Sequence, residues 1–168
     1  ACFALWGPRA RDILQPLTPD SLANDDFPYM TMREITVGDV PVRALRVTFV
    51  GELGWELYCA AEYGAGLWRT LVDAGAPHGL VPAGYKAIDT LRLEKGYRVW
   101  AADITPDDTP YEAGLGFCVK RDKEGGFIGR DALAGGPDDG EGARRLVCIT
   151  LADPSSVALG NEPVRVGG

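Results

Sequence analysis

The sequence predicts an α+β fold in which an antiparallel sheet packs against helices. Stretches with strand-like and helix-like patterns alternate along the 168 residues, and 46% of the residues are hydrophobic, enough for a buried core. Two β-branched runs, 30–37 and 40–50, flank Gly38-Asp39, a dipeptide that favours tight turns. A hairpin of this kind inside a strand–helix alternation favours α+β over a doubly wound parallel sheet.

The other elements of the first part of the chain are expected from their periodicity. They are a core strand at 1–7, a helix at 9–17 that Pro8 can begin, a strand at 50–58, and helices at 62–74 and 84–95. We expect each of the last two helices to bury one apolar face, formed by Tyr63, Leu67, Trp68 and Leu71 in the first and by Tyr85, Ile88, Leu91 and Leu93 in the second.

The rest of the chain is less regular. Residues 96–116 carry little periodicity and predict a long loop, a kind of segment that is often functional. A short helix is expected at 127–133, and a new strand at 144–151. The predicted domains are therefore 1–134 and 144–168, joined by a Gly/Asp-rich linker at 135–143.

Both ends of the chain suggest that it is truncated. It starts without methionine in an apolar run, and it ends on Pro163–Val166 followed by Gly167-Gly168, like a hairpin that lacks its second strand. We therefore expect further sequence on both sides.

Composition limits the class of partner. The net charge of −7 and the pI of about 4.7 argue against nucleic acid and an anionic membrane, and no apolar run approaches the roughly 20 residues that span a bilayer. His78 is the only histidine, which argues against a multi-histidine metal site. The four cysteines (Cys2, Cys59, Cys118 and Cys148) form no CxxC pattern and are expected to be reduced core thiols of an intracellular protein. Neither a phosphate-binding GxxxxGK[ST] nor a GxGxxG motif is present.

The segment VGELGWELY at 50–58 carries the most chemistry. In a strand, Glu52, Gly54 and Glu56 share a face because side chains alternate. If that face points inward, Glu56 needs a hydrogen-bond donor, and a flat heterocycle rich in N–H groups would serve. The alternative is an edge strand with two solvated glutamates, and spacing alone favours it.

Four motifs follow one another in order: VGELGWELY, AGYKAIDTLRLEKGYR, DITPDDTPYEAGLGF and KEGGFIGRDAL. Together with FALWGPRARDILQPLT and FPYMTMREI, they make the chain resemble the folate-binding module of the glycine-cleavage T-protein (aminomethyltransferase) family. The resemblance is closer to the C-terminal half of dimethylglycine and sarcosine dehydrogenases, where this module follows an FAD domain.

The resemblance implies a tetrahydrofolate-binding domain, followed by the start of a C-terminal β-barrel domain. Such modules transfer a one-carbon unit from an N-methyl or aminomethyl donor to tetrahydrofolate. The implied partners are folate, a methylated amine substrate and the remainder of the protein's own chain, with FAD in a preceding domain. The implied compartment is the cytoplasm, or the mitochondrion in a eukaryote. Alternatives are a standalone aminomethyltransferase, a non-enzymatic folate-binding relative, or a scaffold that has lost folate.

Five residues match positions that line the folate in this family. Glu56 matches the glutamate that holds the pterin ring, and Leu57 and Tyr58 follow it as neighbours of the ligand. Phe49 stands where a tyrosine usually lies, so it keeps the stacking face and loses the hydroxyl. Phe117 matches an aromatic that packs on the folate, although it could equally be a core residue.

Other positions bear on the reaction. Ile88 replaces an arginine that true aminomethyltransferases use for substrate binding, which favours the dehydrogenase-linked class. Arg92 and Glu94 are hallmarks of the family, and we expect them to be structural, each paired elsewhere. No residue matches the family's catalytic aspartate, which we expect upstream of Ala1. The chain alone is therefore expected to be inactive.

Overall fold

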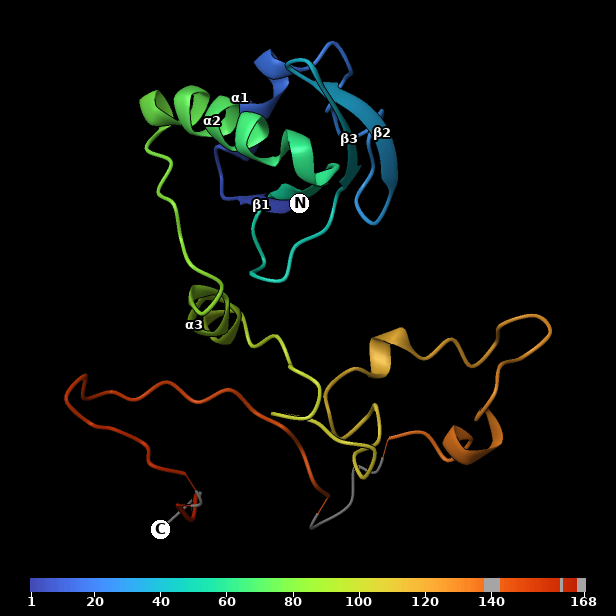
Figure 1. Ribbon diagram of the computed structural model, residues 1–168. Helices are drawn as coiled ribbons and strands as arrows, with labels where there is room; N and C mark the ends of the chain where they lie inside the picture. The colour runs from blue at the N-terminus through green and yellow to red at the C-terminus, as the bar shows by residue number, and fades with distance from the viewer. Residues whose placement is uncertain (138–142, 161, 166–168) are drawn as a thin grey trace. The chain divides into compact units, whose positions relative to one another are not determined.

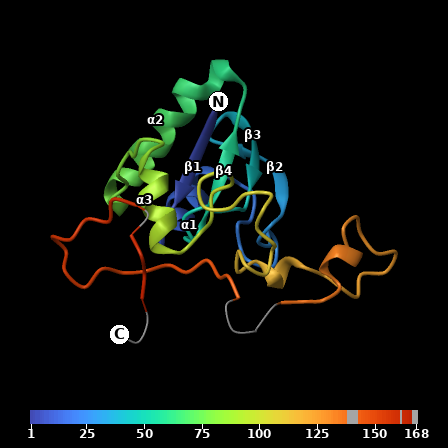
Figure 2. The ribbon, with the colours of Figure 1, turned by 90° about the horizontal axis from the view of Figure 1, so that it is seen from below.

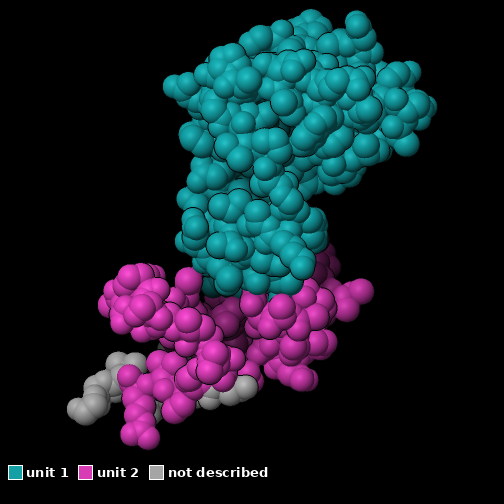
Figure 3. All heavy atoms as spheres, turned by 60° about the vertical axis from the view of Figure 1, so that its left-hand side comes forward, with its two compact units in different colours: residues 1–99 teal, residues 100–168 magenta. Residues whose placement is uncertain are grey.

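The computed structural model describes residues 1–137, 143–160 and 162–165. These fall into two compact units, residues 1–99 and 100–168, which Figure 3 distinguishes by colour. The domain boundary predicted at 135–143 stays a prediction.

The first unit is built on a four-stranded antiparallel sheet with the order β1-β4-β3-β2 (Figures 1 and 2). Its strands are β1 (Cys2–Trp6), β2 (Met32–Val37), β3 (Val40–Leu45) and β4 (Gly54–Tyr58). The predicted hairpin is confirmed, with Val37 paired to Val40 across the turn.

Strand β3 ends earlier than predicted, and β4 begins later. Between them, the hydroxyl oxygen of Thr48 accepts hydrogen bonds from the backbone N–H groups of Val50 and Glu52, at 3.2 and 3.3 Å. A side-chain acceptor of this kind gives the backbone an alternative to a sheet ladder. Glu52 therefore lies in a turn, and the expectation that it shares a strand with Glu56 is wrong.

Two helices contribute to the core on one face of this sheet. They are α1 (Ala10–Leu14), which continues as a 3₁₀ turn (Gln15–Leu17), and α2 (Gly64–Gly75), which runs beside β1 (Figure 2). The largest fully buried side chains of the unit include Leu14, Phe27, Trp55, Leu57 and Leu67. These two elements confirm the helices predicted at 9–17 and 62–74.

The predicted apolar face of α2 is buried only in part. Leu67 and Leu71 are buried in the core, whereas Tyr63 and Trp68 are exposed. Trp68 stacks on Phe3 of β1, with 5.7 Å between ring centroids. The helix thus keeps an aromatic residue beside the edge strand.

Helix α3 (Ala87–Glu94) lies within the predicted helix at 84–95, but the expected burial of its apolar face is wrong. Tyr85 is 87% exposed, and Leu91 and Leu93 are also exposed. The buried residue is Arg92, which donates a 2.9 Å hydrogen bond to the carbonyl of Tyr97. Its Nε lies 3.5 Å from Oδ1 of Asp89, in an ion pair. These contacts agree with the structural role expected for Arg92.

Where the structure describes the second unit, turns stand in place of longer elements. Its described residues form 3₁₀ turns (Gly116–Cys118 and Asp131–Leu133), so the helix predicted at 127–133 is reduced to one turn. The strand predicted at 144–151 is wrong: the N–H of Leu146 donates to the carbonyl of Glu112, and Arg144 bonds Asp108. Residues 163–165 are irregular, and Val166 lies outside the described residues. The described part of 144–168 therefore gives no support to the expected start of a β-barrel.

Composition led to expectations about the cysteines and about membrane-spanning segments. Cys2, Cys118 and Cys148 are exposed and Cys59 is half-buried, so the expectation of core thiols is wrong. Within the described residues, no helix has the length and apolar character needed to cross a membrane.

Candidate functional site

A groove runs along the edge strand β1 of the first unit. It is lined by β1, by Glu56 and Tyr58 of β4, by α2, and by residues 80–85 together with α3; we call it the β1 groove. Its volume is about 700 Å³, within the range of roughly 300–1,000 Å³ that small-molecule sites occupy. The register places Ala4 opposite Glu56 and Cys2 opposite Tyr58, so these side chains share the face of the two strands that meets the groove.

Glu56 and Tyr58 form the polar centre of this groove. The hydroxyl of Tyr58 donates a 2.7 Å hydrogen bond to Oε2 of Glu56. This bond, followed by one with the thiol of Cys2, raises the pKa of Tyr58 above its ordinary value of 10.0. Within the described residues, Oε1 of Glu56 accepts no hydrogen bond, so the carboxylate can still accept N–H donors from a ligand.

The local sequence explains why Glu56 faces the groove. Its neighbours Trp55 and Leu57 are fully buried, and alternation along the strand then directs Glu56 to the opposite face. Gly54 allows the close pairing with β1, because a Cβ at this position would overlap the carbonyl oxygen of Leu5 and lie 2.8 Å from Cδ1 of Trp6. The residue types around Glu56 therefore fix its orientation.

An ion pair lies at the rim of the groove. Nζ of Lys95 is 3.0 Å from Oε1 of Glu52, and this contact raises the pKa of Lys95. The lysine stem passes under Gly51, whose φ of +70° favours glycine and where a Cβ would lie 2.8 Å from Cγ of Lys95. Glu52, the second carboxylate of the motif, is thus paired at the rim.

The structure brings together two of the five predicted site residues. Glu56 and Tyr58 line the β1 groove, whereas the side chain of Leu57 points into the core. Phe49 stacks on Tyr97 with ring centroids 6.1 Å apart and is not among the groove residues. Whether Leu57 and Phe49 act in binding stays a prediction.

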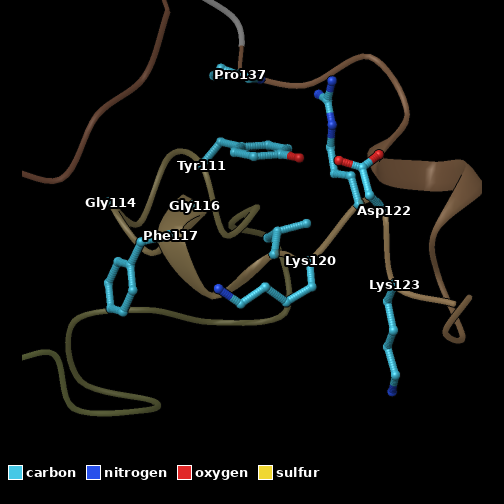
Figure 4. A pocket seen from close by; sticks show the side chains of 10 residues that line it. Tyr111, Gly114, Gly116, Phe117, Lys120, Asp122, Lys123 and Pro137 are labelled. Carbon is cyan, nitrogen blue, oxygen red and sulfur yellow. The ribbon is translucent and has the colours of Figure 1, made fainter.

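The fifth residue, Phe117, belongs to the second unit. It is 75% exposed, so it is not a core residue. It borders a hollow of about 990 Å³ that also contacts Tyr111, Lys120 and Lys123. Figure 4 shows Tyr111, Phe117 and Lys120 around this hollow, with the Lys123 side chain directed away from them. Exposed aromatic surface beside cationic side chains can stack on a planar, anionic group.

Sequence reasoning missed the second wall of the groove. Residues 80–83 form no helix or strand and carry no periodicity, and helical spacing predicts a buried position for Tyr85. Trp68 was likewise expected in the core but lines the groove. The signal for this wall was the presence of large aromatic residues, Trp68 and Tyr85, that the core does not bury.

Comparisons with known proteins agree with the resemblance found in the sequence. The family model for the GCVT N-terminal domain matches residues 1–123. Mitochondrial sarcosine dehydrogenase of Mus musculus is 46% identical over 151 residues, which is 90% of this chain and 16% of that protein. Mitochondrial dimethylglycine dehydrogenase of the same organism is 40% identical over 158 residues, which is 94% of this chain and 18% of that protein.

A shorter relative matches the chain from end to end. The aminomethyltransferase of Symbiobacterium thermophilum is 43% identical over 169 residues, covering 100% of this chain and 44% of that protein. The chain thus spans less than a fifth of the dehydrogenases and under half of the aminomethyltransferase. Since the family model covers well over half of the chain, the chain belongs to the GCVT N-terminal domain family, whose members here include sarcosine and dimethylglycine dehydrogenases and aminomethyltransferases.

Proposed function

We propose that the β1 groove binds tetrahydrofolate and that Glu56 holds its pterin ring. The observation that carries this proposal is the carboxylate of Glu56, oriented by Tyr58 and with Oε1 free of hydrogen bonds within the described residues. A carboxylate can accept two parallel N–H bonds from the 2-amino group and the adjacent ring N–H, a strong charge-assisted arrangement. Oε2 can accept a ligand donor in addition to Tyr58, because each carboxylate oxygen has two lone pairs.

The walls of the groove suit the rest of such a ring. Trp6, Trp68 and Tyr85 offer aromatic surface on which a flat heterocycle can pack. We propose that Leu57 supports binding by anchoring β4 in the core. The packing of Phe117 on the folate, which the resemblance implies, stays a proposal. Phe49 lacks a hydroxyl and can contribute only apolar contact. Tetrahydrofolate supplies the nitrogen atoms that accept a one-carbon unit.

We further propose that the chain is part of an enzyme that transfers this one-carbon unit from an N-methyl or aminomethyl donor. The similarity to sarcosine and dimethylglycine dehydrogenases supports an FAD-dependent protein in which the flavin occupies a different domain. Ile88 lines the β1 groove with an apolar side chain at the position where the resemblance to aminomethyltransferases would require arginine. This supports the dehydrogenase-like assignment.

A standalone aminomethyltransferase is the second candidate. The observation in its favour is the 43% identity to the Symbiobacterium enzyme over the whole chain. The flavin content of the purified full-length protein distinguishes the two candidates: bound FAD supports the dehydrogenase-like enzyme, and its absence after reconstitution supports the aminomethyltransferase.

Folate binding is tested by titrating the full-length protein with 5-formyltetrahydrofolate while following tryptophan fluorescence. We expect saturable binding that Glu56→Gln weakens by about ten-fold or more, which corresponds to about 1.4 kcal/mol for a lost charge-assisted bond. Glu62→Gln is the matched control, since this exposed glutamate lies outside the groove. A folded wild-type protein that binds no folate, or equal affinity in both variants, would contradict the proposal.

A further inference from the structure

Two arginine side chains converge on one amide oxygen in the first unit. Nη2 of Arg11 on α1 and Nη2 of Arg46, just after β3, each donate a 2.7 Å hydrogen bond to Oδ1 of Asn24. Arg46 also donates from Nη1 to the carbonyl of Phe27 at 2.5 Å. Three segments distant in sequence therefore meet at one point through their cationic and amide groups.

This cluster is separate from the β1 groove. Both guanidinium groups lie against Trp55, with Cζ of Arg11 and of Arg46 each 5.9 Å from the ring centroid. Trp55 is fully buried and points to the face of β4 opposite Glu56. Contact with an indole ring holds a guanidinium in place but supplies no negative charge.

The two arginines differ from others that the structure describes. Four arginines have a carboxylate partner: Arg33 with Asp20, Arg43 with Glu34, Arg92 with Asp89, and Arg144 with Asp108. Among the described residues, neither Arg11 nor Arg46 forms such an ion pair, although the chain carries 24 acidic residues. Asn24 gives an acceptor oxygen without a charge.

The surroundings of the pair indicate an unbalanced positive charge. Burial and the nearby charge of Arg11 lower the pKa of Arg46. Nε of Arg11 is buried and has no hydrogen-bond partner within the described residues. The Nη2 atoms, in contrast, make their bonds to Asn24 at the surface, where a ligand can reach them. Positive charge held at the surface in this way can pair with the oxygens of an anionic ligand.

We propose that Arg11 and Arg46 form an oxyanion-binding site that takes a carboxylate or phosphate group of a ligand. Guanidinium groups present their N–H donors in a planar fork that matches the oxygens of these groups. The bound oxyanion supplies the negative charge that Asn24 lacks. The site is independent of folate binding, because it uses neither Glu56 nor any other residue of the β1 groove.

The site can be tested by chemical protection in the full-length protein. Phenylglyoxal modifies accessible arginines, and peptide mass spectrometry measures the rate at each one in sodium phosphate, sodium succinate or sodium chloride at equal ionic strength. At about ten times Kd, we expect occupancy to slow modification of Arg11 and Arg46 by about ten-fold. Arg43, which is already paired with Glu34, serves as the internal control.

The two oxyanions distinguish the source of the ligand group. Protection by phosphate alone indicates a phosphate ester, protection by succinate alone indicates a carboxylate, and protection by both indicates a site for either. Equal rates in chloride and in the oxyanions, or equal protection at Arg43, would overturn the proposal.

Asn24→Asp provides a second test that needs no knowledge of the ligand. The new carboxylate supplies the missing charge from within the protein at nearly unchanged size. We expect this variant to slow modification of both arginines without added oxyanion and to abolish the response to phosphate and succinate. An Asn24→Asp protein that still responds as the wild type does would also refute the site.

Discussion

The hydroxyl of Tyr58 lies 2.7 Å from Oε2 of Glu56, two residues earlier on the same face of β4. The bond restrains the Glu56 carboxylate before any ligand binds. It uses Oε2 and leaves Oε1 able to accept a hydrogen bond from a ligand. Preorganisation of this kind reduces the ordering cost of binding.

Alkaline titration should reveal this bond. Because the neutral hydroxyl donates to a carboxylate, the folded pKa of Tyr58 is above its ordinary value of 10.0. A raised folded pKa means that the stabilising contribution is fully present below pH 10 and is lost as pH rises through the folded pKa. We expect the stability difference between wild type and Tyr58→Phe to be constant below pH 10.0 and to shrink as the pH rises above it. Glu56→Gln should return the NMR-monitored pKa of Tyr58 toward 10.0; an unchanged pKa would contradict the bond.

Gly54→Ala tests the close pairing of β1 and β4. The added methyl group would overlap the carbonyl of Leu5, which belongs to the sheet backbone and cannot move aside cheaply. We expect a loss of about 1–3 kcal/mol or more in the free energy of unfolding, measured by chemical denaturation. Gly66→Ala on α2 is the control: nothing lies within 4 Å of its Cβ position, and it should stabilise the helix by up to about 1 kcal/mol. Similar effects at both glycines would argue against the pairing described.

Adjacent residues of β4 should separate stability from binding. Leu57 is fully buried, so Leu57→Ala should cost about 2–5 kcal/mol of unfolding free energy. Glu56→Gln, one residue away on the groove face, should change stability by no more than about 0.5 kcal/mol while weakening folate binding. Denaturation curves and folate titrations of the two variants check this division. A large loss of stability in Glu56→Gln would show that the carboxylate is structural.

Arg92→Lys should destabilise the end of α3. Arg92 is buried, donates a hydrogen bond to the carbonyl of Tyr97 and forms an ion pair with Asp89, and a lysine cannot reproduce that planar donor geometry. We expect a loss of about 1–3 kcal/mol. Arg69→Lys, at an exposed position of α2, is the control and should have little effect. Equal stability of the two variants would mean that Arg92 contributes charge alone.

Local sequence patterns were sufficient where an element depends on its own residues. The hairpin of β2 and β3 follows from its β-branched runs and its turn, and α2 follows from the spacing of Leu67 and Leu71. The orientation of Glu56 was left open by its spacing and was carried by the resemblance. The structure adds the buried neighbours that direct this side chain into the groove.

Other features depend on partners that periodicity cannot identify. The spacing of Tyr85, Leu91 and Leu93 predicts an apolar helix face, but no element of the first unit covers it. The hydroxyl of Thr48 accepts hydrogen bonds from backbone N–H groups, including that of Glu52, and so ends the strand before Glu52. The alternation of side chains in the sequence does not reveal these bonds. No sequence pattern links Arg11 with Arg46, because only the fold brings both side chains to Asn24.

The sheet order also has a kinetic consequence. Strands β2 and β3 are joined by a tight turn, whereas β1 meets β4 only when the chain closes a long loop, as in the contacts between Ala1 and Cys59, 58 positions apart. Loop-closure entropy delays such distant pairings relative to local ones. We therefore expect the hairpin to form early, β4 to add to it, and β1 to dock last. During synthesis, β1 leaves the ribosome well before its partner exists and must wait unpaired, so the β1 groove is the final part of the first unit to assemble.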